Sequence, residues 1–285
     1  PTDSFEKSAA NGLRGFLGKH LSVDGMERLK AFGKYVLRGE RSEGARYLMT
    51  HSFQKMQLEI LDNCDVFLPN AKTEMDQIAA HLGFRTDNYV VVPNAVDVAS
   101  IKAAKEVEST GYERFSGWIV CIGRIDIRKN QLNLIKAVEG SDYKVVFVGK
   151  KSPGHIEYAN KVVSEIEANP NMEWIEQIPN EDIYKLCREC RVSVLPSWFE
   201  TPGLVSLEAA AMGCNIVVSP KGTTRDYFGD SAFYCDVSSP SSIRAALDEA
   251  YAVNYDEVFG RKVITEYTWE KAAEKTLDGY QLALK

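Results

Sequence analysis

The chain of 285 residues lacks any long hydrophobic run. Apolar stretches such as those at 144–148 and 191–195 are of strand length, whereas a membrane-spanning helix needs roughly 20 apolar residues. We therefore predict no transmembrane segment. The first residues, Pro-Thr-Asp-Ser, also lack the charged and then apolar pattern of a signal peptide. Because residue 1 is not Met, we expect either processing or a missing upstream segment.

An excess of basic residues is absent too. The formal net charge is −6 and the isoelectric point is near 5.4, so no overall positive field exists to hold a polyanion. A nucleic acid is therefore not expected as the principal partner. Hydrophobic residues make up 45% and charged residues 26% of the chain, values that exclude intrinsic disorder and allow a sizeable core.

Cysteine is scarce and irregularly placed, with six residues in the whole chain. Cys64, Cys121 and Cys214 lie within apolar segments, which predicts small buried side chains in a reducing cytosol rather than a disulfide framework. Cys187 and Cys190 form a lone C-x-x-C, but no second pair follows at zinc spacing. We interpret both as packing residues of a helix.

What the sequence does contain is a regular alternation of short apolar segments with amphipathic ones after residue 116. The expected strands are 118–122, 144–148, 173–175, 192–195, 215–218 and 232–234. The expected helices are 131–138, 157–167, 181–187, 204–212 and 241–252. Apolar strands that alternate with helices indicate a parallel sheet covered on both faces. The predicted fold class is therefore α/β, with a doubly wound, Rossmann-like domain that binds ligands at the carboxyl ends of its strands.

The part of the chain before residue 96 has a different pattern. Apolar residues at three- and four-residue spacing predict two helices, separated by Gly39 and Gly44, and a strand-helix-strand unit after them. The expected elements are helices at 26–37 and 45–61, strands at 65–68 and 89–92, and a helix between these strands at 71–82. Residues 102–113 are interpreted as a polar connector.

The loop 123–130 follows the first strand of the predicted sheet and carries cations. Gly123 allows the backbone to come close to a ligand, and Arg124 and Lys129 lie beside the start of a helix, which suits phosphate oxygens. The alternative is a solvated charged turn, because Arg and Lys are common in turns and neither G-x-G-x-x-G nor a P-loop is present. By itself the loop favours the solvated turn and is only weak evidence for a phosphate site.

The loop after the strand 192–195 contains two glutamates. Pro202 and Gly203 open a helix whose first amides are free to donate, so Glu200 and Glu208 flank a predicted anion site. In the alternative interpretation Glu200 caps the helix and Glu208 is an exposed helical acid. The apolar neighbours of Glu208 favour a ligand role, because an unpartnered carboxylate among them would be costly.

These residues carry a resemblance to a known family. The pair Glu200 and Glu208, in the setting F-E-T-P-G-L-V-S-L-E-A-A-A-M-G, resembles the E-x7-E motif of the retaining, GT-B-fold glycosyltransferases of family 4. The segment 92–97, V-P-N-A-V-D, is similar to the family's interdomain P-N-G-V-D, and the loop 123–130 is similar to its basic clamp. The motifs stand in the family's order, and the match spans about Glu59 to the C-terminus.

The resemblance implies a GT-B architecture. Residues 1–95 are then a partial N-terminal, acceptor-side domain, of which only helices and the last strand-helix-strand unit are visible. Residues 96–262 form the C-terminal donor-binding domain for a nucleotide sugar. Residues 263–285 contain an amphipathic helix, expected at 269–284, that crosses back to the N-terminal domain.

The implied activity is the transfer of a hexosyl group from a nucleoside-diphosphate sugar, such as a UDP- or GDP-hexose, to a glycan, lipid-linked or other acceptor. Configuration is retained. The implied catalytic residues are Arg124 and Lys129, which neutralise the diphosphate, and Glu200, which holds the sugar hydroxyls. No metal or other cofactor is implied, and the sequence agrees, since it has no D-x-D and two cations can stabilise a leaving diphosphate electrostatically.

The resemblance also implies further donor-binding residues around Arg124, Lys129 and Glu200. They are Gly123, Ile178, Thr201, Pro202, Gly203, Leu204, Val205 and Glu208. The amides at 204–205 meet the phosphates, Glu208 holds the ribose, and the loop around Ile178 borders the base.

The sequence departs from the family pattern at several positions. Ala95 stands where Gly is usual and Asn215 where Pro is usual. The segment P-K-G-T-T-R-D-Y replaces the usual G-G-x-x-E, which leaves Asp226 or nothing in the place of the acid. The family's glycine-rich acceptor loop and functional histidine are not matched. We therefore interpret the four histidines as surface or packing residues: His20, His51, His81 and His155.

Other interpretations stay open. The chain could be a nucleotide-sugar-binding module without transfer activity, or a GT-B-fold sugar-nucleotide epimerase or glycogen-phosphorylase relative, although neither enzyme normally carries this glutamate pair. The expected location is the cytoplasm, and peripheral contact with the inner face of the membrane is left open. The nucleotide, sugar, acceptor and oligomeric state do not follow from the sequence.

Overall fold

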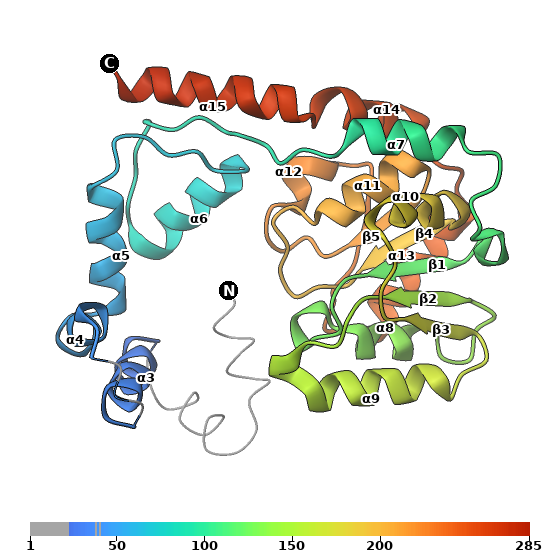
Figure 1. Cartoon of the computed structure of the whole chain (residues 1–285), viewed down its shortest axis with the longest axis horizontal. Helices are drawn as coiled ribbons and strands as arrows, with labels where there is room; N and C mark the ends of the chain where they lie inside the picture. Colours follow the sequence, from blue (N-terminus) through green and yellow to red (C-terminus); the bar gives the residue numbers. More distant parts are fainter. Residues whose placement is uncertain (1–22, 38, 40) are drawn as a thin grey trace. The chain divides into compact units, whose positions relative to one another are not determined.

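The computed structural model describes residues 23–37, 39 and 41–285 (Figure 1). The chain divides into two compact units. The second unit contains residues 69–73 and 91–278 and carries the sheet, and the first unit contains the other described residues.

Within the described residues, six strands form one parallel sheet in the order β3-β2-β1-β4-β5-β6. The strands are β1 Ile119–Ile122, β2 Val145–Val148, β3 Met172–Ile175, β4 Val192–Leu195, β5 Asn215–Val218 and β6 Phe233–Tyr234. The strand order reverses direction between β1 and β4, which are neighbours although two strands separate them in the chain. Such a switch point is where doubly wound sheets bind ligands, at the carboxyl ends of the strands.

Helices cover both faces of this sheet (Figure 1). The helices of the second unit are α7 Val98–Glu106, α8 Gln131–Val138, α9 Ile156–Glu167, α10 Asn180–Glu189, α11 Leu204–Met212, α12 Thr224–Phe228, α13 Pro240–Ala252 and α14 Glu257–Glu266. Side chains alternate across β1, so Val120 and Ile122 enter the core with α7, α10, α11 and α14. Ile119 and Cys121 enter the opposite core with α8, α9 and α13. The predicted doubly wound α/β fold is confirmed.

The expected elements of the sheet domain agree closely with the structure, and α8, β4, α11 and β5 match them residue for residue. The polar connector expected at 102–113 is wrong over its first part, because α7 runs to Glu106. Asp97 caps this helix by accepting a 3.0 Å hydrogen bond from the amide of Ser100. Ile101 and Ala104 form the buried face of the helix. Two further helices, α12 and α14, were not expected.

The first unit contains helices α3 Val23–Leu37, α4 Glu43–Thr50 and α5 Phe53–Asp62, with most of α6 Lys72–Leu82. The single helix expected at 45–61 is wrong. His51 and Ser52 interrupt it, and the Ser52 hydroxyl caps α5 by accepting a 3.0 Å hydrogen bond from the amide of Lys55.

The strands expected at 65–68 and 89–92 are also wrong. Only one parallel bridge forms there, between Phe67 and Tyr89. Val92 still donates to the carbonyl of Pro69 at 2.8 Å. Pro69 has no N–H to return the second hydrogen bond, so the pairing ends before a strand can develop.

The last helix, α15, runs from Trp269 to Ala283, close to the helix expected at 269–284. Residues 279–285 belong to the first unit and the preceding residues of α15 to the second. The assignment of residues 1–95 to an acceptor-side domain stays a prediction.

All six cysteines lie in the described part of the chain and are free thiols. The prediction of a buried side chain is wrong for Cys64, which is exposed after the end of α5. Cys187 and Cys190 are buried, and their carbonyls accept hydrogen bonds from the Cys214 thiol at 3.0 and 3.4 Å. The interpretation of this C-x-x-C as packing is therefore confirmed.

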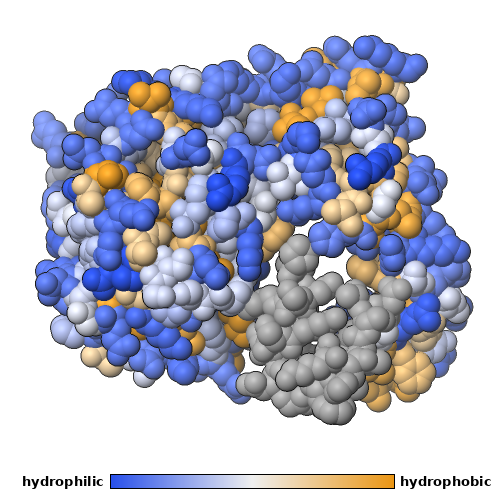
Figure 2. Space-filling view, turned by 180° about the vertical axis from the view of Figure 1, so that it is seen from behind, coloured by the Kyte–Doolittle hydropathy of each residue, from blue (hydrophilic) through white to orange (hydrophobic). Residues whose placement is uncertain are grey.

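The surface of the molecule is mainly hydrophilic in the view of Figure 2, with hydrophobic residues in scattered groups. Over residues 23–37, 39 and 41–285, no helix combines the length and apolarity that crossing a membrane would require.

Two glycines allow the ends of β1 and β2 to approach each other. The amide of Gly123 donates to the carbonyl of Val148 at 2.8 Å, and Gly149 follows with φ of 149°. A Cβ at position 149 would overlap the backbone carbonyl of Gly123. Any side chain there would therefore displace the loop that begins at Gly123.

This close approach predicts a specific stability loss in Gly149→Ala. Gly140 is a matched control, because its φ is 68° and no atom lies within 4 Å of a Cβ built there. Gly140→Ala should cost only the strain of a left-handed alanine, roughly 1–2 kcal/mol. Gly149→Ala should cost about 1–3 kcal/mol more, because it also overpacks the backbone. Urea unfolding of both variants measures the difference, and equal losses would contradict the close approach.

Candidate functional site

The loops singled out in the sequence meet at the carboxyl ends of β1 and β4, all within the second unit. The first runs from Gly123 through a short 3₁₀ helix, Ile127–Lys129, into α8. The carboxylate of Asp126 accepts a 3.2 Å hydrogen bond from the amide of Lys129, which shapes this turn. The carbonyl of Arg124 accepts a further bond from Gln131 at 2.9 Å. Hydrogen bonds with nearby residues of the chain therefore fix the backbone at Arg124 and Lys129.

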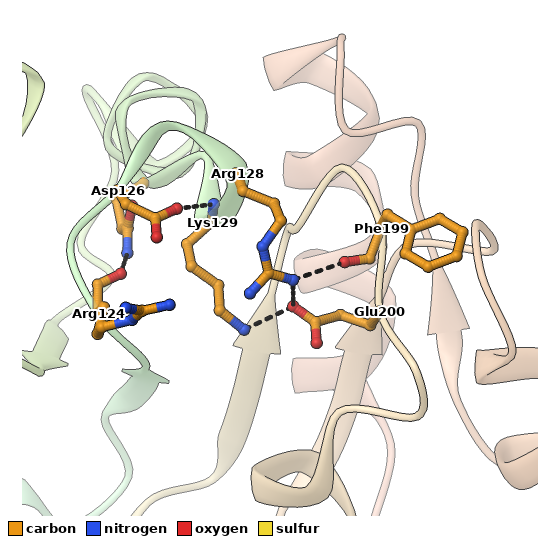
Figure 3. A network of polar contacts seen from close by, with 7 residues as sticks. Arg124, Asp126, Arg128, Lys129, Phe199 and Glu200 are labelled. Atoms are coloured by element: carbon orange, nitrogen blue, oxygen red, sulfur yellow. Dashed lines mark hydrogen bonds and ion pairs between the residues drawn. The ribbon is translucent and has the colours of Figure 1, made fainter. Parts of the chain in front are cut away.

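Lys129 and Glu200 form an ion pair across the two loops (Figure 3). The ammonium Nζ lies 2.5 Å from Oε1 of the carboxylate, and the two side chains are only 13% and 9% exposed. The stem of Lys129 lies over Gly123, where a Cβ would come within 3.3 Å of Cε. The missing side chain of Gly123 therefore leaves room for the lysine to reach Glu200.

Arg128 is a second cation on the same carboxylate, and it was not among the residues expected from the sequence. Its Nη1 lies 3.4 Å from Oε1 of Glu200 and donates to the carbonyl of Phe199 at 3.1 Å. Figure 3 shows Arg128 and Lys129 approaching Glu200 together. One carboxylate is thus shared by two cations.

The backbone of Glu200 is held from the other side by residues that were also missed. Its carbonyl accepts a 3.0 Å hydrogen bond from the amide of Thr223, and Glu200 forms a parallel bridge with Gly222. Gly222 has φ of 97°, and a Cβ there would overlap the carbonyl oxygen of Glu200. The signal for this contact was present in the segment P-K-G-T-T, which departs from the family pattern. Asp226, which follows in α12, is exposed.

Arg124 is exposed at this edge of the sheet. Its side chain extends from the same loop as Lys129 (Figure 3), and its guanidinium has no hydrogen-bond or ion-pair partner among the described residues. It is therefore available to an anion, whereas Lys129 is already paired.

The start of α11 presents unused amides. Gly203, with φ of 84°, is the N-cap residue and no side chain caps the helix. Within the described part of the chain, the N–H groups of Leu204 and Val205 have no acceptor. The alternative that Glu200 caps this helix is therefore wrong, and the amides at 204–205 remain free to bind an anion.

Glu208 is half-buried on the second turn of α11, so its interpretation as an exposed acid is also wrong. It has a partner that sequence reasoning missed, because the hydroxyl of Tyr184 donates to Oε1 at 3.1 Å. Burial raises the pKa of Glu208 above its ordinary value of 4.5. The Tyr184 hydrogen bond lowers this pKa, and the negative charge of Asp97 raises it further.

The remaining expected residues line the same edge. Ile178, in the loop after β3, is half-buried against the core. Thr201 is exposed and Pro202 is buried between Glu200 and the start of α11. Three fully buried hydroxyls of the described chain have no hydrogen-bond partner, two in the loops of this site and one in the first turn of α11: Ser197, Thr223 and Ser206.

Three of the four histidines lie within the described residues. His51 stacks on Tyr47 with ring centroids 4.0 Å apart, His81 contacts the carbonyl of Gln77, and His155 is exposed before α9. His20 lies outside the described residues. In the part of the chain that the structure describes, no group of three or more His, Cys, Asp or Glu residues is placed to hold a metal ion.

The chain matches the family model of the glycosyl transferases group 1 over residues 114–262, which is just over half of its length. This range contains the whole of the site described above. The chain belongs to this family.

Curated relatives and solved structures agree with the assignment. The chain is similar to the D-inositol 3-phosphate glycosyltransferase of Paenarthrobacter aurescens, at 24% identity over 86% of this chain and 63% of the relative. It spans 48% and 63% of the length of the first two curated relatives that it matches.

Two solved structures share the fold. A glycosyltransferase from Rickettsia africae superposes with a TM-score of 0.71 at 14% identity, covering 96% of this chain and 89% of that one. A structure described as trehalose-6-phosphate from E. coli bound with UDP-2-fluoro glucose superposes with a TM-score of 0.65 at 14% identity, covering 81% and 63%. The structural neighbours are glycosyltransferases of the GT-B type, so the expected fold class is confirmed.

The raised pKa of Glu208 predicts a pH dependence of the stability of this chain. The folded chain keeps this proton to a higher pH than the unfolded chain, so the contribution of Glu208 to stability is complete below about pH 4.5 and is lost as the pH rises through the raised pKa. Glu208→Gln keeps an acceptor for Tyr184 and cannot ionise. Its melting temperature should therefore exceed that of the wild type at pH 7, and the difference should shrink towards pH 4.5.

Thermal unfolding of the two proteins across this pH range measures the effect. Exposed Glu270→Gln is the control, because its pKa is lowered rather than raised and its variant should show the opposite trend. A difference for Glu208→Gln that is constant with pH would contradict the assignment.

Proposed function

We propose that this chain transfers a hexosyl group from a nucleoside-diphosphate sugar to an acceptor, with retention of configuration and without a metal ion. The observation that carries the proposal is the convergence of free helix amides, an unpaired arginine and a buried lysine-glutamate pair at the switch point of the sheet. The donor class agrees with the UDP-2-fluoro glucose of the E. coli structure. Retention follows from the resemblance to family 4.

The diphosphate would lie between the first loop and the start of α11. Arg124 and Lys129 supply positive charge, and the amides of Leu204 and Val205 supply hydrogen-bond donors at a helix N-terminus. Negative charge develops on the leaving diphosphate as the glycosidic bond breaks, so preorganised cations here lower the barrier. This arrangement performs the task that a metal ion performs in other transferases.

The two glutamates would bind opposite sides of the donor. Glu200 accepts hydrogen bonds from sugar hydroxyls, and Glu208 accepts them from the ribose. The half-buried position of Glu208 suits recognition of a hydroxyl pair, because a hydrogen bond to a carboxylate is strong where water is excluded. The loop around Ile178 would border the base.

The acceptor would be a glycan or a lipid-linked sugar, and the N-terminal unit would bind it. The free cysteines agree with the reducing cytoplasm, which is the proposed location. A donor-binding module without transfer activity is the alternative, and assays of transfer and hydrolysis alongside binding separate the two.

The proposal predicts binding of a nucleoside diphosphate in the absence of metal. A thermal-shift series with UDP, GDP and ADP in EDTA should show stabilisation by at least one of them, about 2.7 kcal/mol at a hundredfold excess over Kd. Arg124→Ala and Lys129→Ala should weaken this binding by about tenfold or more, because hydrogen bonds to charged groups contribute about 1.5–3 kcal/mol.

Lys136→Ala is the matched control, since it removes the same charge from the exposed face of α8. No stabilisation by any of the three nucleotides would contradict the donor site. Equal weakening by Lys136→Ala would show only a general effect of charge.

The two glutamates predict different ligand profiles in calorimetry. Glu208→Gln should weaken nucleoside diphosphate and sugar nucleotide alike, because both contain the ribose. Glu200→Gln should weaken only the sugar nucleotide, by about 1.5–3 kcal/mol. It should strengthen binding of the diphosphate alone, since Lys129 and Arg128 lose the carboxylate that now neutralises them. Equal losses for both ligands in Glu200→Gln would contradict the assigned geometry.

A further inference from the structure

Arg128 has no role in the proposed function, yet it connects the two loops of the site at three points. Its carbonyl accepts a 2.9 Å hydrogen bond from the amide of Trp198, and its Nη1 donates to the carbonyl of Phe199 at 3.1 Å. The same nitrogen lies 3.4 Å from Oε1 of Glu200. Its backbone and side chain therefore hold the segment 198–200 from one side.

The proposed function makes conflicting demands on Lys129. Its ammonium pairs with Glu200, and the same ammonium is proposed to hold the diphosphate. A diphosphate carries more negative charge than one carboxylate, so it draws Lys129 away from Glu200. A carboxylate that is only 9% exposed would be destabilised if no other cation stayed beside it.

We propose that Arg128 is the positioning residue that keeps Glu200 in place when Lys129 turns to the diphosphate. This inference rests on the proposed function. The planar guanidinium offers several N–H donors in a rigid arrangement, so it can hold the Phe199 carbonyl and the Glu200 carboxylate together, which a single ammonium does less well. Arg128 acts through Glu200 and leaves the donor contacts to Arg124 and Lys129.

A double-mutant cycle on donor binding and turnover tests this role. Arg128→Ala should weaken binding of the sugar nucleotide and lower kcat by about tenfold, while the affinity for the nucleoside diphosphate stays within about threefold. In the Glu200→Gln background, Arg128→Ala should add less than about twofold, because the two residues then act as one unit. Arg128→Lys, which keeps the charge, should recover part of the loss.

Two controls keep the test decisive. Arg244→Ala on α13 removes an arginine that also pairs with a carboxylate, Asp248, and it should change neither ligand's affinity. The melting temperature of every variant shows whether the fold survives, and if Arg128→Ala unfolds, Arg128→Lys replaces it in the cycle.

The possible results distinguish a failure of this inference from a failure of the proposed function. If wild-type protein binds neither nucleoside diphosphate nor sugar nucleotide, the proposed function fails and the inference fails with it. If wild type binds both and the losses of Arg128→Ala and Glu200→Gln are additive, the inference alone is overturned. Equal losses for the two ligands in Arg128→Ala would overturn it as well, because Arg128 would then contact the diphosphate itself.

Discussion

The ion pair between Lys129 and Glu200 is the interaction on which the rest of the site depends. It joins loops 71 residues apart in the chain, and both side chains are largely removed from water. Removal of Glu200 would leave the largely buried Lys129 ammonium without its carboxylate, which costs more than the pair itself contributes. Two neighbouring residues position this pair. Asp126 shapes the turn that carries Lys129, and the amide of Thr223 holds the backbone of Glu200.

The pair can form because the parallel sheet brings the carboxyl ends of β1 and β4 to one edge. Close approach of backbone to backbone completes the arrangement. Gly149 and Gly222 occupy positions where a Cβ would overlap a carbonyl, of Gly123 in one case and of Glu200 in the other. The geometry of the candidate site therefore depends on the packing of its loops, because a side chain at either glycine would move one of them.

Much of the sheet domain could be predicted because its signals are local. Strands such as 192–195 and 215–218 are fully buried and mostly apolar, and the helix 204–212 begins after a glycine. The N-terminal part was predicted less well, because a single residue decided the outcome in each case. Ser52 interrupts one expected helix with a cap, and Pro69 ends an expected strand pair by withholding an N–H.

By itself the sequence determined the α/β alternation and the doubly wound fold. It also placed Arg124, Lys129 and Glu200 in loops, and Glu208 near the start of a helix, at the edge where a parallel sheet gathers the ends of its strands. Only the tertiary structure decided which groups these charges contact. Lys129 shares the carboxylate of Glu200 with Arg128, and the carboxylate of Glu208 accepts a hydrogen bond from Tyr184 of another helix. The physical reason is that burial obliges a charge to find a partner, whereas the identity of that partner depends on distances in space that no spacing along the chain encodes.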